Sequence, residues 1–250
     1  MRKSVLITGA TGTLGRALSL EFAKTQHDVA MQYRSDSGID LLVEEVRSQG
    51  VKGISIEANF DFEDIDGLSK SVTQILETEF GGLDIAVLNA SSQELTAWND
   101  LTAVDWDAMY VNSLRHTAVL LKTLADFMQT RSNPVIVIVG SIEGIRPNIN
   151  HAPYGVFKAA LHHLVTAAAY ELGKKNIRVV GVAPGLINRE GLETDWKSGV
   201  DSYREHTALH RLVEANEVAK VIRFLASEDA SAITGVTLPV DAGWSAHPGW

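Results

Sequence analysis

Seven short apolar runs, separated by longer amphipathic segments, constrain the fold of this chain more than any other feature. Several runs are apolar at consecutive rather than alternate positions, which is typical of strands buried on both faces of a parallel sheet. The runs cover residues 4–8, 28–33, 52–58, 83–90, 134–140, 177–183 and 235–241. The amphipathic segments cover residues 14–25, 39–49, 63–80, 104–130, 152–174 and 215–227. This alternation predicts an α/β Rossmann fold, a doubly wound seven-stranded parallel sheet with helices on both faces and ligands at the carboxyl ends of its strands.

Composition narrows the class of protein further. A chain of 250 residues fits one domain with a single large core, and no repeat, linker or low-complexity tract divides it, so we predict one domain over residues 1–250. The net charge of -9 argues against a nucleic-acid partner. The first apolar run ends at Thr8, too short for a signal peptide, and no run approaches a membrane span, so no membrane partner is expected. The absence of cysteine excludes disulfides and thiolate sites and suits a cytoplasmic protein.

Three glycines, Gly9, Gly12 and Gly15, follow the first predicted strand in the stretch TGATGTLGRAL. In a strand-to-helix turn the first glycine permits the tight turn, the second lets the backbone approach a pyrophosphate, and the third lets the helix pack closely. The N-terminus of the helix then offers its amides to the anion. A glycine pattern alone is a weak signal, and a turn that binds nothing is the alternative. Its position at the first turn of a parallel sheet favours a dinucleotide site.

The end of the second strand bears on which dinucleotide is bound. A carboxylate there would bond the ribose 2′-hydroxyl of NAD, whereas an arginine accommodates the 2′-phosphate of NADP. The strand ends at Tyr33 and is followed by Arg34 and Ser35, with Asp36 soon after. We therefore predict NADP(H), with Arg16 as a candidate second cation. NAD(H) stays open, because Arg34 can also be an ordinary loop cation.

With the glycine turn, the alternating strands and the motif YGVFK (154–158), the sequence resembles the short-chain dehydrogenase/reductase family over nearly its whole length. The middle glycine of the family motif falls at Gly12, with Thr13 in its usual place, and LNAS (88–91) stands where the family has Asn-Asn-Ala-Gly. The resemblance implies a cofactor site formed by Gly9, Thr11, Gly12, Thr13, Leu14, Gly15, Arg34, Ser35, Asn59, Phe60, Asn89, Ala90, Tyr154, Lys158, Pro184, Gly185 and Ile187.

The same resemblance implies a catalytic tetrad of Asn112, Ser141, Tyr154 and Lys158. Each residue also has an ordinary interpretation. Asn112 could be a helix-breaking polar residue, Ser141 a loop hydroxyl, and Tyr154 with Lys158 a surface pair. Together with a dinucleotide turn they indicate reversible reduction of a ketone or aldehyde, with Tyr154 as proton donor. A non-catalytic redox sensor that binds NADP(H) is the alternative function.

The chemistry of the tetrad follows from charge and position. A free phenol has a pKa of about 10, and a neighbouring cation lowers it. Lys158 follows Tyr154 by one helical turn, so we expect its ammonium to lower the pKa of Tyr154 and to bond the nicotinamide ribose. Ser141 can donate to the substrate oxygen, and by resemblance Asn112 holds a water that links Lys158 to solvent. Asn150 and Pro153 suit the cap and the first turn of this helix.

The substrate loops follow the fourth, fifth and sixth strands. Candidate pocket residues there are Gln93, Trp98, Glu143, His151 and Leu186. Residues 186–210 have the pattern of a substrate lid, and a solvated insertion is the alternative. The sequence is similar to 3-oxoacyl-carrier-protein reductases and to pteridine reductases, which implies a small carbonyl or alcohol substrate without naming it.

His162 and His163 are adjacent in the predicted catalytic helix. Adjacent residues do not face one site on a helix, so we predict no metal site and assign them to packing or to a subunit interface. The family resemblance implies a homotetramer, or a homodimer, built on this helix and the one before it.

Overall fold

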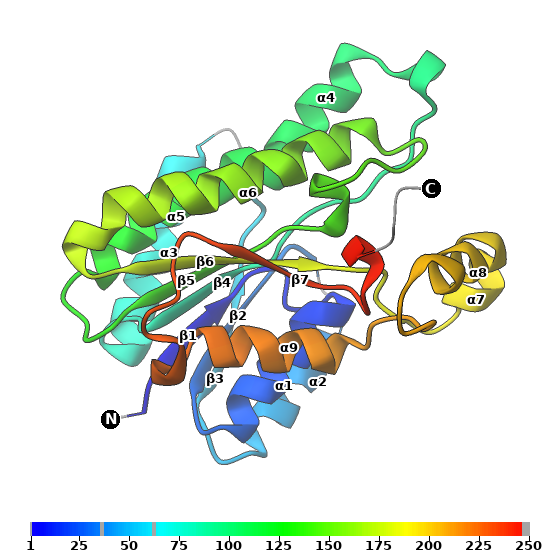
Figure 1. Ribbon diagram of the computed structural model, residues 1–250. Helices are drawn as coiled ribbons and strands as arrows, with labels where there is room; N and C mark the ends of the chain where they lie inside the picture. Colours follow the sequence, from blue (N-terminus) through cyan, green and yellow to red (C-terminus); the bar gives the residue numbers. More distant parts are fainter. Residues whose placement is uncertain (1, 36–37, 62–63, 247–250) are drawn as a thin grey trace.

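A seven-stranded sheet forms the centre of the protein, in the order β3-β2-β1-β4-β5-β6-β7 with every neighbouring pair parallel (Figure 1). The computed structural model describes residues 2–35, 38–61 and 64–246. The strands are β1 (Ser4–Ile7), β2 (Asp28–Tyr33), β3 (Gly53–Glu57), β4 (Ile85–Leu88), β5 (Val135–Val139), β6 (Arg178–Pro184) and β7 (Thr237–Val240). The predicted doubly wound α/β fold is confirmed.

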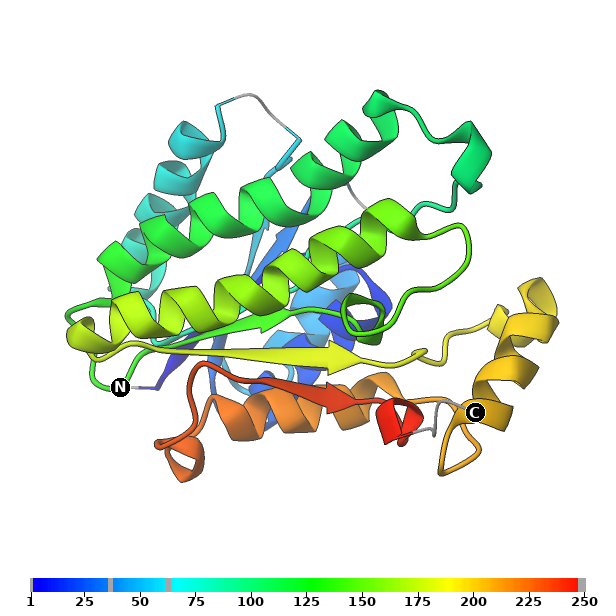
Figure 2. The same cartoon turned by 45° about the horizontal axis from the view of Figure 1, so that its top comes forward.

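Helices cover both faces of the sheet, as Figures 1 and 2 show. One face carries α1 (Thr13–Lys24), α2 (Ile39–Arg47) and α9 (Ala215–Leu225), and the other carries α3 (Ile65–Phe80), α5 (His116–Met128) and α6 (Ala152–Leu172). Short 3₁₀ turns lie at Trp98–Asp100, Ile142–Gly144, Gly173–Lys175, Glu228–Ala230 and Trp244–Ala246. No helix within the described ranges is long and apolar enough to cross a lipid bilayer.

The two apolar cores explain why the strands are apolar at consecutive positions. Along β5, Val135, Val137 and Val139 belong to the core under α1, α2 and α9. Ile136 and Ile138 belong to the core under α3, α5 and α6. Because successive side chains of a strand point to opposite faces, a strand covered by helices on both sides needs an apolar residue at every position.

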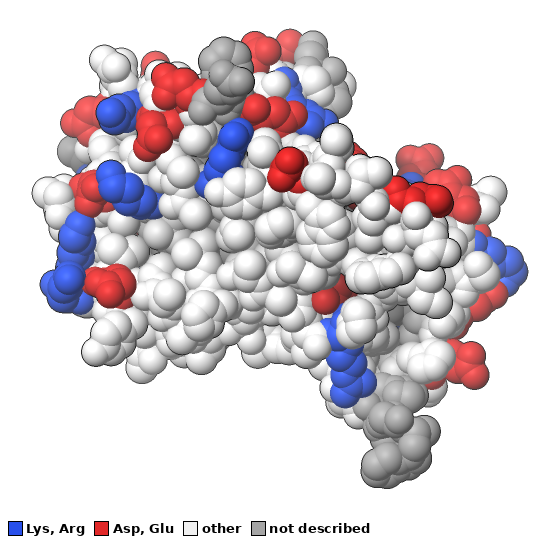
Figure 3. All heavy atoms as spheres, turned by 90° about the horizontal axis from the view of Figure 1, so that it is seen from above, with Lys and Arg blue, Asp and Glu red and all other residues white. Residues whose placement is uncertain are grey.

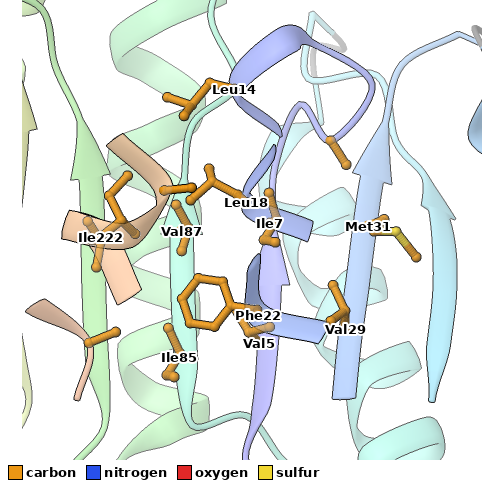
Figure 4. Close-up of a cluster of buried hydrophobic side chains, with 14 of the residues drawn as sticks. Val5, Ile7, Leu14, Leu18, Phe22, Val29, Met31, Ile85, Val87 and Ile222 are labelled. Carbon is orange, nitrogen blue, oxygen red and sulfur yellow. The ribbon is translucent and has the colours of Figure 1, made fainter. Parts of the chain in front are cut away.

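Helix α1 is held on the sheet by large buried side chains. Leu18 and Phe22 lie against Val5 and Ile7 of β1 and are inaccessible to solvent (Figure 4). Fully burying a Leu or Phe side chain contributes about 2 kcal/mol each. This packing fixes the N-terminus of α1 at the carboxyl end of β1, beside β4, where the direction of strand order reverses and ligands are bound in such sheets.

The predicted helix over residues 104–130 is interrupted. Its parts are α4 (Ala103–Met109), a π-helical segment η2 (Tyr110–Arg115) and α5. Side chains bond carbonyls of the wider turn: Nδ1 of His116 lies 3.0 Å from the oxygen of Val111, and Thr117 donates to Ser113 at 2.7 Å. Hydrophobic periodicity does not distinguish such a turn from a continuous helix. Glu63, the predicted start of the third helix, lies outside the described residues.

Residues 186–210 form a small layer beyond the carboxyl edge of the sheet (Figure 1). This layer contains α7 (Leu192–Asp195) and α8 (Lys197–His206). Leu192, Val200 and Tyr203 build a separate apolar cluster with Ile142 and Leu212. The Tyr203 hydroxyl donates to the Asp241 carbonyl at 2.7 Å, which ties the layer to the end of β7.

Candidate active site

The turn between β1 and α1 requires glycine at two positions. Gly9 has a φ of +65°, and a Cβ there would lie 3.0 Å from Cα of Ala90. At Gly15 a Cβ would lie 2.1 Å from the carbonyl oxygen of Gly9, so no side chain fits between α1 and the turn. The tight-turn and close-packing roles predicted for these glycines are confirmed.

Hydrogen bonds lock this turn to the end of β4. The Thr8 hydroxyl accepts from the backbone N–H groups of Asn89 at 2.8 Å and Ala90 at 3.0 Å. Asn89 Nδ2 donates back to the Thr8 carbonyl at 2.9 Å. A residue that sequence reasoning missed, Gln32, accepts from the N–H of Gly9 at 2.9 Å and donates to Ala58 at 2.6 Å. The sequence signal that could have identified Gln32 is its polar amide near the end of a mostly apolar strand.

A cavity of about 430 Å³ opens over this turn. Of the residues predicted to bind the cofactor, it is lined by Gly9, Thr11, Gly12, Thr13, Leu14, Gly15, Arg34, Ser35, Phe60, Asn89 and Ala90. The nearest atom to a Cβ on Gly12 would be the Gly9 oxygen at 3.5 Å, so the protein itself does not require glycine there. A glycine on a cavity wall, at the N-terminus of a helix with no acid in its first turn, fits a pyrophosphate.

Asn59 does not line this cavity, although it was predicted to contact the cofactor. Its side chain is exposed and accepts from the N–H of Asp61 at 3.1 Å. Its neighbours Ala58, Phe60 and Asp61 line the cavity instead. Successive side chains of extended backbone point to opposite sides, so not every residue after β3 can face the cavity. The sequence does not show which of these residues do so.

Both cations predicted near the 2′-phosphate are paired with acids. Nη1 of Arg34 lies 3.4 Å from Oδ2 of Asp61, and the Arg34 side chain is 61% exposed. Arg16 lies 3.1 Å from Glu45. Arg34 lines the cavity, whereas Arg16 does not. Arg34 therefore lies at the smaller cavity as predicted, with the carboxylate of Asp61 beside it.

A larger cavity of about 1120 Å³ lies at the carboxyl edge of the sheet and shares wall residues with the first, among them Thr13, Leu14 and Asn89. Its walls include most of the remaining predicted site: Ser141, Tyr154, Lys158, Pro184, Gly185 and Ile187. Asn112 belongs to η2 and lines the smaller cavity. Three tetrad residues thus share one cavity, and the fourth lies in the adjoining one.

Tyr154 and Lys158 are both buried at the start of α6, on one side of the helix. The Lys158 ammonium lies 5.4 Å from the centre of the Tyr154 ring and donates to the carbonyl of Val139 at 3.1 Å. Burial lowers the pKa of Lys158 to about 8. The two side chains point to the same cavity, as their spacing predicted.

The expected depression of the Tyr154 pKa is wrong for this structure. Burial raises the pKa of Tyr154 to about 12; a hydrogen bond with Ser141 lowers it in part, and the charge of Glu143 raises it again. Desolvation of the phenolate outweighs the other effects because the ring is enclosed by α6 and the loop after β5. The phenol is therefore protonated throughout the neutral range.

The start of α6 also differs from expectation. The residue at the N-cap is His151, not Asn150, and Pro153 lies in the first turn as predicted. Asn150 precedes the cap with a φ of 60°. Asn tolerates this left-handed conformation well, which explains why it serves the turn rather than the cap.

The predicted substrate residues divide into two groups. Gln93, Glu143, His151 and Leu186 line the larger cavity, whereas Trp98 is 72% exposed and lines neither cavity. Residues of the 186–210 layer also face the larger cavity: Arg189, Leu192, Asp195, Trp196, Ser198, Gly199, Ser202, Tyr203 and His206.

Three histidines near the site have distinct surroundings. His162 packs beneath Ser141, with its Nε2 3.4 Å from the Ser141 nitrogen, while His163 is exposed. His116 was not among the predicted site residues. It stacks on Phe60 with ring centres 5.1 Å apart, and its Nε2 lies 3.1 Å from the Ala90 oxygen. Burial lowers the pKa of both His162 and His116. Among the described residues, no group of three or more His, Asp or Glu side chains is placed to bind a metal.

Fold and site together define a nucleotide-binding oxidoreductase, and comparisons with known proteins identify the family. The family profile described as enoyl-(acyl carrier protein) reductase matches residues 9–245. The chain is 30% identical to the 3-oxoacyl-acyl-carrier-protein reductase FabG of Staphylococcus epidermidis over 247 residues, covering 97% of this chain and 99% of that protein. It is 31% identical to human dehydrogenase/reductase SDR family member 4, covering 96% of this chain and 87% of that protein.

A solved structure agrees. The short chain dehydrogenase of Burkholderia cenocepacia in complex with NADP is 27% identical and superposes with a TM-score of 0.90, covering 97% of this chain and 98% of that one. The chain belongs to the standard-length branch of the short-chain dehydrogenase/reductase family and is an NAD(P)-dependent enzyme.

Proposed function

We propose that this chain is a cytoplasmic, NADPH-dependent reductase that converts a ketone or aldehyde reversibly into an alcohol. The observation that carries the proposal is the enclosure of Ser141, Tyr154 and Lys158 in one cavity that joins the glycine-turn cavity. A protein that only senses NADP(H) has no need of a buried proton donor at that place.

The residues have separate tasks in this reaction. The bound nicotinamide would supply the hydride. Tyr154 gives its proton to the carbonyl oxygen as negative charge develops there, and Ser141 donates a hydrogen bond to the same oxygen. Lys158 has further N–H donors beyond the one directed to Val139, and these suit the ribose hydroxyls. Asn112, in the adjoining cavity, would hold the water through which Lys158 reaches solvent.

The raised pKa of Tyr154 suits a proton donor. A phenol with a pKa of about 12 is protonated at neutral pH and ready to donate to the substrate oxygen.

The test is NADPH consumption with a panel of ketones, aldehydes, diketones, 3-oxoacyl thioesters and pterins. Tyr154→Phe should lower kcat about 1000-fold, because it removes the proton donor while keeping the ring. The Kd for NADPH should change less than about threefold, since the hydroxyl is a small part of that site. A variant that keeps a tenth of the rate rules out Tyr154 as the donor. Tight NADPH binding with no turnover across the panel would favour the sensor.

We further propose that Arg34 selects NADP(H) through the 2′-phosphate. Its exposed side chain at the cofactor cavity and the NADP complex of the related Burkholderia cenocepacia enzyme support this choice. Arg34→Ala should weaken NADPH binding about tenfold and leave NADH binding nearly unchanged. Asp61→Asn, which removes the competing carboxylate, should strengthen NADPH binding. A wild-type preference for NADH would overturn the assignment.

The layer of residues 186–210 is proposed as a lid over the substrate. Many of its residues face the larger cavity, and Leu192, Val200 and Tyr203 of the layer pack on Ile142 in the loop that carries Ser141. Slower proteolysis within 186–210 when NADPH and substrate are both bound would support closure; unchanged cleavage would contradict it.

A homotetramer, or a homodimer, is proposed to form through α5 and α6. The face over these helices carries few charges, which gather at its edges (Figure 3). On α6 the exposed side chains include Val156 at 52% and Tyr170 at 89%. Uncharged, partly apolar faces of this kind mark interaction sites. Light scattering that gives a monomer mass would refute this proposal.

A further inference from the structure

A second polar pair, Glu143 and His151, stands in the wall of the larger cavity. Nδ1 of His151 lies 2.7 Å from Oε2 of Glu143, and their side chains are only 4% and 14% exposed. Glu143 belongs to the 3₁₀ turn after Ser141, and His151 is the N-cap of α6. The reaction proposed above uses neither side chain.

The pair has hydrogen-bonding capacity that the protein does not meet. Nε2 of His151 is buried and has no hydrogen-bond partner among the described residues. A buried polar atom without a partner is destabilising, so such atoms in cavity walls point to a ligand. The His151 ring is therefore a candidate ligand contact.

The chemistry of the pair sets the kind of group it binds. An ionised carboxylate only accepts hydrogen bonds, so Nδ1 of His151 carries the proton that lies between them. In a neutral imidazole the other nitrogen, Nε2, is then an acceptor. The unmatched atom thus calls for a donor, and among carbonyl substrates the ordinary donor is a hydroxyl group.

The place of the pair sets where that hydroxyl lies. The rings of His151 and Tyr154 are stacked with centres 4.8 Å apart. A substrate whose carbonyl oxygen meets the Tyr154 hydroxyl therefore brings its nearest carbons beside His151. We propose that Glu143 and His151 form a hydroxyl-binding subsite, and that the substrates of this enzyme are ketones with a hydroxyl group on the first or second carbon from the carbonyl. This inference rests on the proposed reductase function and specifies its substrate class.

The experiment compares ketones that differ only in the hydroxyl group. The pairs are 1-hydroxy-2-butanone with 3-pentanone, and 4-hydroxy-2-butanone with 2-pentanone. The wild-type enzyme should prefer the hydroxylated member of at least one pair by about 30-fold in kcat/KM, the effect of one hydrogen bond to a charged or charge-paired group. Equal rates within both pairs would overturn the inference and leave the reductase function standing.

Variants separate recognition from simple bracing. His151→Phe keeps a ring against Tyr154 but has no acceptor, so the preference should fall to within about threefold of unity while 3-pentanone is still reduced. His151→Gln, whose amide oxygen is an acceptor, should restore part of the preference. Glu143→Gln can donate to Nδ1 and so turn Nε2 into a donor, which should also reduce the preference. The matched control Glu171→Gln, at an exposed pair with Lys174, should leave it unchanged.

Two further results would overturn the subsite. One is a preference for 2,3-pentanedione over both hydroxyketones that His151→Phe abolishes, because the pair would then donate rather than accept. The other is a fall in the rate for all ketones alike in His151→Phe, which marks a structural role. Binding is measured in parallel as the Tm shift caused by 1-hydroxy-2-butanone in the presence of NADPH. A shift that His151→Phe removes supports the subsite even if no ketone is reduced, and no shift with any ketone counts against it.

Discussion

Two buried charged side chains, Asp84 and Lys158, lie at opposite ends of the strands of the sheet, and their surroundings differ. At the amino edge, Asp84 precedes β4 and is 6% exposed. It accepts from the N–H of Ser4 at 2.8 Å and from Arg131 at 2.9 and 3.0 Å. Burial alone would raise the pKa of Asp84, but the hydrogen bonds from Arg131 and Ser4 outweigh it and hold that pKa below its ordinary value. This charge is fully matched by the protein.

At the carboxyl edge, Lys158 is 2% exposed and has one hydrogen-bond partner among the described residues, the Val139 carbonyl. An ammonium has three donors, so most of its capacity is unmet. The lowered pKa of Lys158 has the same cause, because burial disfavours the charged ammonium and no carboxylate offsets this effect.

The difference shows which of these two charges serves the fold and which serves a ligand. A matched buried charge stabilises only the folded chain, whereas an unmatched one is destabilising until a ligand supplies its partners. Asp84 therefore helps to hold the strands together, and Lys158 retains hydrogen-bond donors for the proposed dinucleotide. Four measurements test this difference between Asp84 and Lys158.

The largest effect is expected from Lys158→Met. Loss of the ammonium should lower kcat/KM about 1000-fold, because the proposed contact to the ribose and the positioning of Tyr154 both depend on it. The same change should stabilise the protein by about 2 kcal/mol, since an unmatched buried charge is replaced by an apolar chain of similar length. Steady-state kinetics and urea unfolding measure the two effects. A variant that is both active and less stable would contradict the comparison.

The opposite pattern is expected from Asp84→Asn. The free energy of unfolding should fall by about 3 kcal/mol, because the Arg131 guanidinium loses its charged partner. For a chain of this size that lowers Tm by about 9 °C. The rate per folded molecule should not change, since Asp84 lies at the far edge of the sheet. Glu171→Gln, at a pair whose side chains are 71% and 74% exposed, is the control and should cost less than about 0.5 kcal/mol.

The pH dependence of stability should show the two charges separately. The pKa of Lys158 is about 8 in the folded protein and 10.5 in the unfolded chain. Burial of the ammonium therefore lowers the free energy of unfolding by its full amount below pH 8, and this loss fades as the pH rises toward 10.5. Between about pH 7 and 9.5 the wild-type protein should gain about 2 kcal/mol relative to Lys158→Met. The pKa of Asp84 is lower in the folded protein than its value of 3.8 in the unfolded chain. The ionised Asp84 therefore stabilises the folded protein above pH 3.8, and this stabilisation is lost as the pH falls through the pKa of the folded state. Parallel wild-type and Lys158→Met profiles would exclude an unmatched ammonium.

The parts that could be predicted from the sequence are those set by local pattern. Consecutive apolar residues such as Val135 to Val139 require cover on both faces, and the steric needs of Gly9 and Gly15 are fixed within one turn. Tyr154 and Lys158 share a helix face because four residues make about one turn. Each of these inferences involves residues close together in the chain.

The parts that could not be predicted depend on contacts between distant segments. The pKa of Tyr154 is a balance between burial and partners that the one-turn spacing to Lys158 does not reveal. The ion pair of Arg34 with Asp61 joins the ends of β2 and β3, and the Glu143–His151 pair spans a loop of irregular backbone. The π-helical turn around Asn112 leaves the apolar pattern nearly unchanged, so periodicity alone predicted one straight helix.

The smallest expected effect tests whether the two edges act independently. Val139, the Lys158 partner, ends β5, and the β5 residue Val135 pairs with Ile85 next to Asp84, so about four residues of strand, or roughly 13 Å, separate the charges. Sites this far apart with no shared partner are additive within about 0.5 kcal/mol. The free energy of unfolding of Asp84→Asn with Lys158→Met should therefore equal the sum of the single changes within that margin. A larger coupling, measured by urea unfolding of all four proteins, would mean that strain at one edge is transmitted through the sheet to the other, and the amino edge would then also contribute to the geometry of the active site.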